Sequence, residues 1–262
     1  MKSLFLILVV SYISSSFGIL VIDEYSVIKV IGGIKHAKTN KALFTGDKVL
    51  SNEKLKFVET SSKAALISKQ KGRFMLNPSP SGTVKEGLLP AMNNVSSRAG
   101  ALLNALDLKK HFAEKYLILS SYEVEVSATA YPMDDDHFFF LRFTYNGEEV
   151  SKKLSFTGNK LKLNSDEILK VDGKAITLKE GTKVELIYRN APEKSSESVA
   201  VFEPVFANEK ALITECKLII SELGKDADAE TKKEQLLAYL TENYGKPNQE
   251  NFNNWIKHNV GI

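Results

Sequence analysis

The fold of this chain is set by residues 27–78, which read VIKVIGGIKHAKTNKALFTGDKVLSNEKLKFVETSSKAALISKQKGRFMLNP. Short apolar or alternating runs recur there at intervals of about 10 residues, and clusters of turn-forming residues separate them. Residues 27–31 are rich in β-branched side chains, and apolar residues alternate with polar ones in residues 54–58 and 73–77. Short strands at this spacing predict a β-sandwich or a small barrel.

The order of parts in this stretch resembles the FecR-type domain. The resemblance rests on Gly33, residues 43–47 (LFTGD), Leu55, residues 62–66 (SKAAL) and residues 72–78 (GRFMLNP). It implies a β module over about residues 27–78, whose Gly-Asp and Gly-Arg pairs serve as turn residues. Proteins with that domain are often envelope sensors joined through a membrane helix to a cytoplasmic partner, and we do not expect that signalling role here. The whole chain also resembles uncharacterised exported proteins of Bacteroidetes, a likeness that implies no activity.

The first 18 residues have the pattern of a secretory signal peptide. Lys2 gives a basic start, residues 3–13 (SLFLILVVSYI) are almost wholly apolar, and Ser16 and Gly18 are spaced like a signal-peptidase site. The apolar run is shorter than the roughly 20 residues that span a bilayer, so a membrane anchor is the less favoured interpretation. We therefore expect cleavage after Gly18, export to the periplasm or the extracellular space, and no transmembrane helix in the mature chain.

Composition narrows the class of protein. The chain has 262 residues, of which 43% are hydrophobic and 26% charged, as in an ordinary globular protein. The formal net charge of +3 is too small to indicate nucleic-acid binding. Cys216 is the only cysteine, so no disulfide can form within the chain, and this favours a bacterial envelope protein. We expect Cys216 to be a packed core residue rather than a reactive thiol.

The sequence divides into five parts. They are a signal peptide (residues 1–18), a FecR-like β module (19–80), a partly helical linker (81–115), a second antiparallel β module (116–206) and a C-terminal helical segment (207–262). In the linker, Ser96 or Ser97 can cap a helix that carries Leu102, Leu103 and Leu106, although a packed linker without a helix fits equally well.

The second β module is predicted from its hairpin signals. Residues 138–145 are dense in aromatic side chains, and Asn146-Gly147 follows them at once as the strongest short hairpin signal of the chain. Further glycine-containing turns divide the block into about six antiparallel strands. Pro204 in the last strand indicates an edge position or a strand end, because proline has no backbone N–H.

Three helices are predicted after residue 207. Asn208 caps the first helix, which ends at Gly224, the second ends at Gly245, and Asn248 caps the third. Their apolar stripes are expected to pack on their own domain rather than on a partner, with Trp255 as an anchor. The predicted fold class is therefore mainly β with a C-terminal α-helical tail (α+β), with two antiparallel β-sandwich or small-barrel modules.

The sharpest candidate for chemistry is the run 134–137, DDDH. Asp134, Asp136 and His137 are possible ligands of a divalent cation. Neighbours on an extended chain point in opposite directions, so the alternative is a hydrated turn before the aromatic strand. The run fits no standard metal-ligand spacing, and the sequence contains no phosphate-binding loop or nucleophile elbow.

These observations favour a non-enzymatic envelope protein without a cofactor, which acts as a protein-interaction or structural module. An alternative is a glycan- or peptide-binding module that uses aromatic residues such as Tyr122, Tyr131 and Tyr145. A cation-dependent hydrolase that uses Asp134, Asp136 and His137 is a third hypothesis. The expected partner is an envelope protein or a polysaccharide, and not a nucleic acid.

Overall fold

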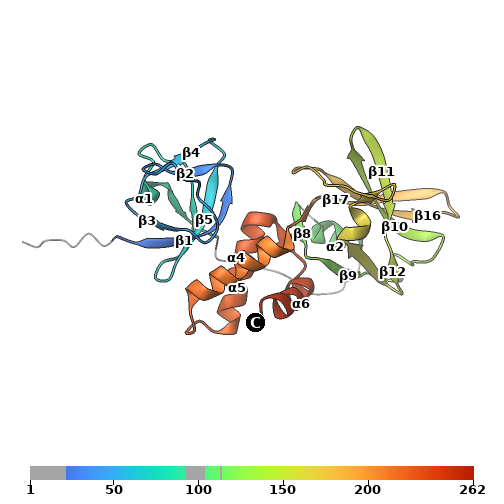
Figure 1. Ribbon diagram of the computed structural model, residues 1–262. Helices are drawn as coiled ribbons and strands as arrows, with labels where there is room; N and C mark the ends of the chain where they lie inside the picture. The colour runs from blue at the N-terminus through green and yellow to red at the C-terminus, as the bar shows by residue number, and fades with distance from the viewer. Residues whose placement is uncertain (1–21, 93–103, 113) are drawn as a thin grey trace, which may run out of the picture.

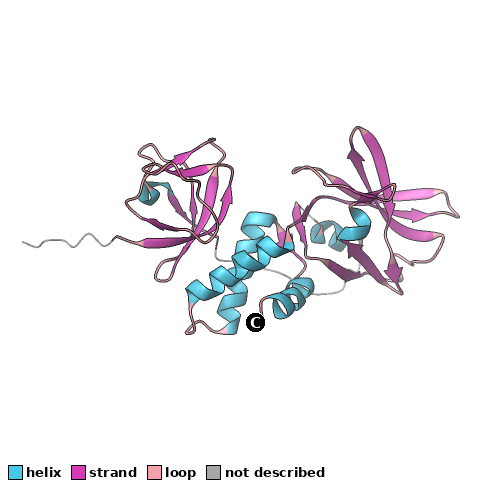
Figure 2. Ribbon diagram, in the orientation of Figure 1, coloured by secondary structure: helices cyan, strands magenta, loops and turns pink. Residues whose placement is uncertain are grey.

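The structure, a computed structural model, describes residues 22–92, 104–112 and 114–262. It is mainly β, with several antiparallel sheets and a set of C-terminal helices, which confirms the predicted α+β class. Figure 1 shows two β-rich modules with the C-terminal helices between them, and Figure 2 shows that strands dominate both modules. Seven residues named in the sequence analysis lie outside the described ranges: Lys2, Ser16, Gly18, Ser96, Ser97, Leu102 and Leu103.

The described residues 22–92 form the first β module. Its elements are β1 (Glu24–Ile31), β2 (Ile34–His36), β3 (Lys48–Leu50), β4 (Leu55–Phe57), β5 (Lys63–Ser68), β6 (Gly72–Leu76), α1 (Val84–Gly87) and β7 (Leu88–Pro90). A five-stranded antiparallel sheet has the order β3-β1-β5-β6-β7, and β2 pairs with β4. Val27, Ala64 and Leu66 point into a core of the module's own, which Val49 and Leu76 complete.

Gly32 and Gly33 lie where two segments of the first module approach each other closely. Gly32 has φ +71°, a conformation that L-residues with a side chain rarely adopt. A Cβ atom on Gly32 would also lie 2.6 Å from the Ser62 Oγ atom, and one on Gly33 would lie 2.6 Å from Val58 Cγ2. Glycine is therefore required at both positions for the chain to turn from β1 into β2.

The second module begins after the linker. Its elements are α2 (Ala105–His111), β8 (Lys115–Ile118), β9 (Ser121–Glu125), β10 (His137–Tyr145), β11 (Glu148–Lys153), β12 (Phe156–Thr157), β13 (Lys160–Asn164), α3 (Ser165–Ile168), β14 (Lys170–Val171), β15 (Lys174–Ala175), β16 (Val184–Asn190) and β17 (Ser195–Phe206). One sheet has the order β11-β10-β16-β17-β8-β18, in which β18 (Lys246–Pro247) comes from the C-terminal segment, and β12, β13 and β9 form another sheet. Phe139, Leu141 and Phe143 of β10 point into the core of the module.

The predicted hairpin at Asn146-Gly147 is present. Both residues have positive φ, and they join β10 to β11 with Tyr145 opposite Glu148. The predicted linker helix corresponds to α2 of the second module, but α2 begins after Asn104, whose side chain caps it, and Leu106 is exposed.

The sequence does not predict one strand pairing. Residues 203–206 of β17 pair in parallel with β8, beyond the last pair with β16, which joins Val184 to Phe202. Pro204 therefore lies inside β17 but past the end of β16, so its missing N–H interrupts no ladder with that neighbour.

The three C-terminal helices match their predicted ends. They are α4 (Glu209–Leu223), α5 (Ala229–Tyr244) and α6 (Gln249–Asn259), with the short β18 (Lys246–Pro247) before the last. Asn208 and Asn248 accept hydrogen bonds from the N–H groups of Ala211 and Asn251, as helix caps do. In the described part of the chain, no helix is long and apolar enough to cross a membrane.

The helices are a connector rather than a free tail. Their buried side chains, among them Cys216 and Trp255, share one core with Ile28 and Ile67 of the first module and Leu117 of the second. Burial confirms the predicted packing role of Cys216 and raises the pKa of its thiol. Because both modules contribute to this core, the helices hold them in a fixed arrangement.

A buried arginine reinforces the contact between the first module and α5. Arg73 of β6 is only 4% exposed, and its guanidinium donates to Gln235 Oε1 (3.1 Å), to Glu242 Oε2 (3.3 Å) and to the carbonyl of Met92. The other oxygen of Glu242 accepts from the Met92 N–H group at 3.1 Å. These bonds satisfy a charge that would otherwise be costly to bury.

Candidate functional site

The predicted metal ligands form a turn. Asp134 Oδ1 accepts hydrogen bonds from the backbone N–H groups of Asp136 (2.9 Å) and His137 (2.7 Å), and it lies 2.9 Å from His137 Nδ1. An aspartate that holds the next residues in this way is an Asx turn. Over the described residues, no three His, Cys, Asp or Glu side chains are grouped so that they could hold a metal ion. Asp134, Asp136 and His137 therefore lie in a turn before β10, as the alternative interpretation expects.

The tyrosines expected to bind a glycan are not on the surface. Tyr122 and Tyr131 are 7% and 4% exposed and belong to the core of the second module, where Tyr145 packs against them as a half-buried neighbour. The prediction that Tyr122 and Tyr131 bind a glycan is therefore wrong. Side chains of β9 alternate between the core and solvent, and Tyr122 is on the core side; the turn after β9 directs the Tyr131 ring into the same core. Aromatic residues do reach the outer face of β10, where Phe138 and Phe140 lie 6.4 Å apart.

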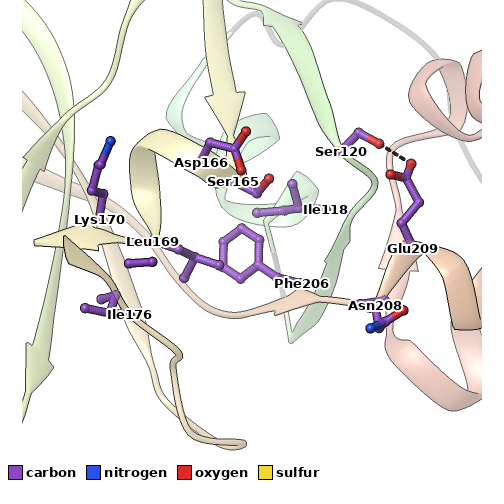
Figure 3. Close-up of a pocket in the computed structure, with 12 residues that line it drawn as sticks. Ile118, Ser120, Ser165, Asp166, Leu169, Lys170, Ile176, Phe206, Asn208 and Glu209 are labelled. Atoms are coloured by element: carbon purple, nitrogen blue, oxygen red, sulfur yellow. Dashed lines mark hydrogen bonds between the residues drawn. The ribbon is translucent and has the colours of Figure 1, made fainter. Parts of the chain in front are cut away.

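A cleft lies where the second module meets α4. Its volume is about 670 Å³, within the range of pockets that hold small ligands. Five elements of the second module (β8, α3, β14, β15 and β17) and the start of α4 contribute to its wall (Figure 3). The apolar part of the lining consists of Ile118, Leu169, Ala175, Ile176, Phe206 and Ala207, and the polar part of Ser120, Ser165, Asp166, Lys170, Asn208 and Glu209.

The topology explains why these residues meet. Ile118 and Ser120 stand at the end of β8, and Phe206 stands at the end of β17, which runs parallel beside it. Parallel strands place both carboxyl ends at one edge, and the chain passes from there directly into α4. The segment from α3 to β15 approaches the same edge and closes the cleft with Leu169 and Ile176.

Glu209 is held in place by two donors. Its Oε1 atom accepts from the Ser120 hydroxyl at 2.6 Å and from the indole Nε1–H of Trp255 at 2.9 Å. The bond from Ser120, and after it the bond from Trp255, lowers the pKa of Glu209 below its usual value. Glu209 therefore presents a fixed, ionised carboxylate to the cleft.

Two further charges at the cleft are not neutralised by neighbours. Asp166 and Lys170 are both exposed, and neither forms an ion pair with another described residue. Figure 3 shows Asp166 between Lys170 and the pair formed by Ser120 and Glu209. The cleft therefore offers charges of both signs beside an apolar floor.

None of the four histidines reaches the cleft to activate its serines. His36 contacts Glu53 (2.5 Å), His111 contacts the Tyr116 hydroxyl (2.7 Å), His137 contacts Asp134, and His258 contacts the Asn254 carbonyl (2.6 Å). A hydroxyl needs an adjacent base to act as a nucleophile. The base beside Ser120 is the Glu209 carboxylate, which accepts from its hydroxyl at 2.6 Å.

Sequence reasoning did not find this cleft. Ser120, Asp166, Lys170 and Glu209 come from three separate segments and share no local spacing. Among the residues that line the cleft, the sequence singled out Asn208, as the cap of a helix. That cap determines where α4 begins and therefore where Glu209 lies.

Comparison with known proteins gives no relative: no protein-family model, no curated protein and no solved structure matches this chain. The assignment of function therefore depends on the geometry of the chain itself.

Proposed function

We propose that this chain is an exported envelope protein that acts as a binding module without a catalytic role, and that the cleft between the second module and α4 holds its ligand. The proposal includes the FecR-like character of the first module, which the sequence suggests. The observation that carries it is the cleft itself, where an apolar floor lies beside Asp166, Lys170 and Glu209.

The rest of the fold supports a module built for binding. The helices share a core with both β modules, so the wall formed by the start of α4 is fixed relative to the wall formed by α3 and β15. A ligand that enters a preformed site loses less free energy to ordering the protein than one that must assemble its site.

The outer face of β10 is a second place where a partner protein could bind. The Lys153 ammonium lies 4.1 Å from the ring centroid of Phe138, and Val201 on β17, two strands away in the same sheet, is 55% exposed. The Lys153 ammonium already covers the Phe138 ring, whereas Asp166 and Lys170 at the cleft have no ion-pair partner among the described residues. The cleft is therefore the favoured site.

A blocked cleft tests the binding function. Ala175 lines the cleft and is exposed, so Ala175→Phe fills space there without altering a core, and Ala128→Phe in an exposed turn is the matched control. We expect a panel of short peptides and oligosaccharides, screened by native mass spectrometry, to contain a saturable ligand of the wild type. Its affinity should fall at least tenfold in Ala175→Phe and stay unchanged in Ala128→Phe. Equal affinity in both variants would exclude the cleft.

Export has a separate test. Mass spectrometry of the protein isolated from cells that express the whole chain should find a mature N-terminus at Ile19 in the periplasmic or extracellular fraction. An intact N-terminus in the cytoplasmic fraction contradicts export but leaves the cleft untouched.

A further inference from the structure

We infer that the ligand of the cleft is a short peptide with a free amino terminus and a free carboxylate, which places an apolar side chain on the floor of the cleft. This inference rests on the proposed binding function and names the class of ligand. Three features of the cleft carry it: the floor, the charges of both signs and the volume.

The apolar floor of the cleft favours a ligand with a hydrocarbon side chain. Ile118 and Ile176 are buried, and Leu169 and Phe206 are partly buried beside them. An apolar side chain placed on these residues leaves water, which contributes roughly 25 cal/mol for each Å² removed from solvent. A purely polar sugar would gain little from that surface.

The rim selects for a zwitterion. Asp166 and Glu209 are carboxylates that can accept hydrogen bonds from a ligand ammonium, and the Glu209 Oε2 atom makes no hydrogen bond to the described residues. Lys170 can donate to a ligand carboxylate, and Figure 3 shows it on the far side of Asp166 from Glu209. Donors and acceptors of opposite charge on one rim match a molecule that carries both charges.

The volume indicates a peptide rather than a single amino acid. A cleft of about 670 Å³ lies well inside the range for drug-sized ligands. Ser165 lies beside Asp166 (Figure 3), and its hydroxyl can bond to a peptide N–H or C=O group, whereas the Ser120 hydroxyl donates to Glu209 and can accept from a peptide N–H group.

The single tryptophan gives a direct readout. Trp255 is the only tryptophan of the chain, and its Nε1 atom donates to Glu209 at 2.9 Å. A ligand ammonium at Glu209 changes the electrostatic surroundings of the indole, so we expect the emission of Trp255 to report occupancy.

The test is a titration of the full mature chain with Ala-Leu-Ala, with its N-acetylated form, with its C-terminal amide and with chitotriose. Ala-Leu-Ala should bind saturably and change Trp255 emission, and capping either end should weaken binding about tenfold, the typical loss when a hydrogen bond to a charged group is removed.

Variants of the cleft show which residue binds each terminus of the peptide. In Lys170→Gln the amide and the free acid should bind equally, and in Asp166→Asn the acetylated and free forms should differ less than in the wild type. Lys174→Gln and Asp172→Asn, on the exposed β14–β15 hairpin outside the cleft, should behave as wild type. Circular dichroism and melting curves check that every variant is folded.

Each result decides the inference. Tenfold discrimination at both termini, lost in the matching variant, supports it. Equal binding of capped and free peptides, or no peptide binding at millimolar concentration, overturns it. Saturable chitotriose binding that is lost in Ala175→Phe would overturn the peptide class while leaving the binding function intact, and failure of the whole panel would count against both.

Discussion

The indole Nε1–H of Trp255 in α6 donates a hydrogen bond of 2.9 Å to Oε1 of Glu209, the first residue of α4. The same oxygen accepts from Ser120, which follows β8. One carboxylate thus joins two helices and the second β module at the rim of the cleft. This junction makes the surroundings of the cleft measurable through the only tryptophan in the chain.

The titration of Glu209 follows from this junction. Because the bonds from Ser120 and Trp255 lower the pKa of the folded carboxyl, its stabilising contribution is complete above the unfolded value of about 4.3 and is lost as the pH falls through the lowered folded value. We expect Trp255 emission to change in that acid range for the wild type and to stay flat in Glu209→Gln. An identical acid transition in both proteins would show that Glu209 is not the group reported.

His111 should make the free energy of unfolding depend on pH in a range above that in which Glu209 titrates. Burial, and secondarily the charge of Lys246, lowers its pKa to about 4, so the unfolded chain binds a proton between pH 6.5 and 4 that the folded chain does not. The contribution of His111 is complete above about pH 6.5 and falls by about 1.4 kcal/mol per pH unit as the pH drops toward 4.

His111→Gln keeps an acceptor for the Tyr116 hydroxyl and removes the titration. Urea unfolding at several pH values should therefore show a shallower acid limb for His111→Gln than for the wild type. Parallel curves for the two proteins would contradict a neutral, buried His111.

Arg73 should be essential for docking the first module on the helices. Arg73→Met leaves Glu242 without its buried partner, so we expect the free energy of unfolding to fall by about 3 kcal/mol. The double variant Arg73→Met/Glu242→Gln should recover part of that loss. Lys71→Gln, which removes only an ion pair of an exposed lysine with Asp23, should change the free energy of unfolding far less than Arg73→Met does. Equal effects of Arg73→Met and Lys71→Gln would contradict the account.

Substitutions of two glycines distinguish the cost of backbone strain from the cost of a steric contact. Gly32 and Gly46 both have positive φ, but only Gly32 would place a Cβ atom against another residue, Ser62. Gly46→Ala should lower the free energy of unfolding by about 1 kcal/mol, the cost of a left-handed L-residue. Gly32→Ala should lower it further, as measured by chemical denaturation. If the two variants were equally stable, the contact with Ser62 would carry no energetic weight.

The elements that the sequence predicted well are those with local causes. Asn146-Gly147 forms its hairpin through its own backbone conformation. Asn208 and Asn248 accept hydrogen bonds from N–H groups three residues later in the chain. Both kinds of signal can therefore be recognised from the sequence alone. The DDDH run was equally visible, but adjacency in sequence made it a metal candidate where the structure has a turn around Asp134.

The features that the sequence left open depend on distant pairings. The parallel contact between Phe206 and Ile118 joins strands more than 80 residues apart, and it creates the edge where Ser120 and Glu209 meet. The apolar stripes of the helices predicted burial, but their periodicity is the same whether the partner is their own module, the other module or both. Only the shared core with Ile28 and Leu117 shows that they connect the two modules.

The most direct measurement is hydrogen exchange along the backbone, with and without saturating Ala-Leu-Ala. We expect slower exchange in peptides that cover residues 165–176 and 206–209, where the Ile176 N–H group bonds to the Leu169 carbonyl and the Leu169 N–H group to the Ser165 carbonyl. Exchange in residues 137–153, on the outer sheet face, should not change. Protection confined to residues 137–153, or none anywhere at saturation, would contradict a ligand site in the cleft.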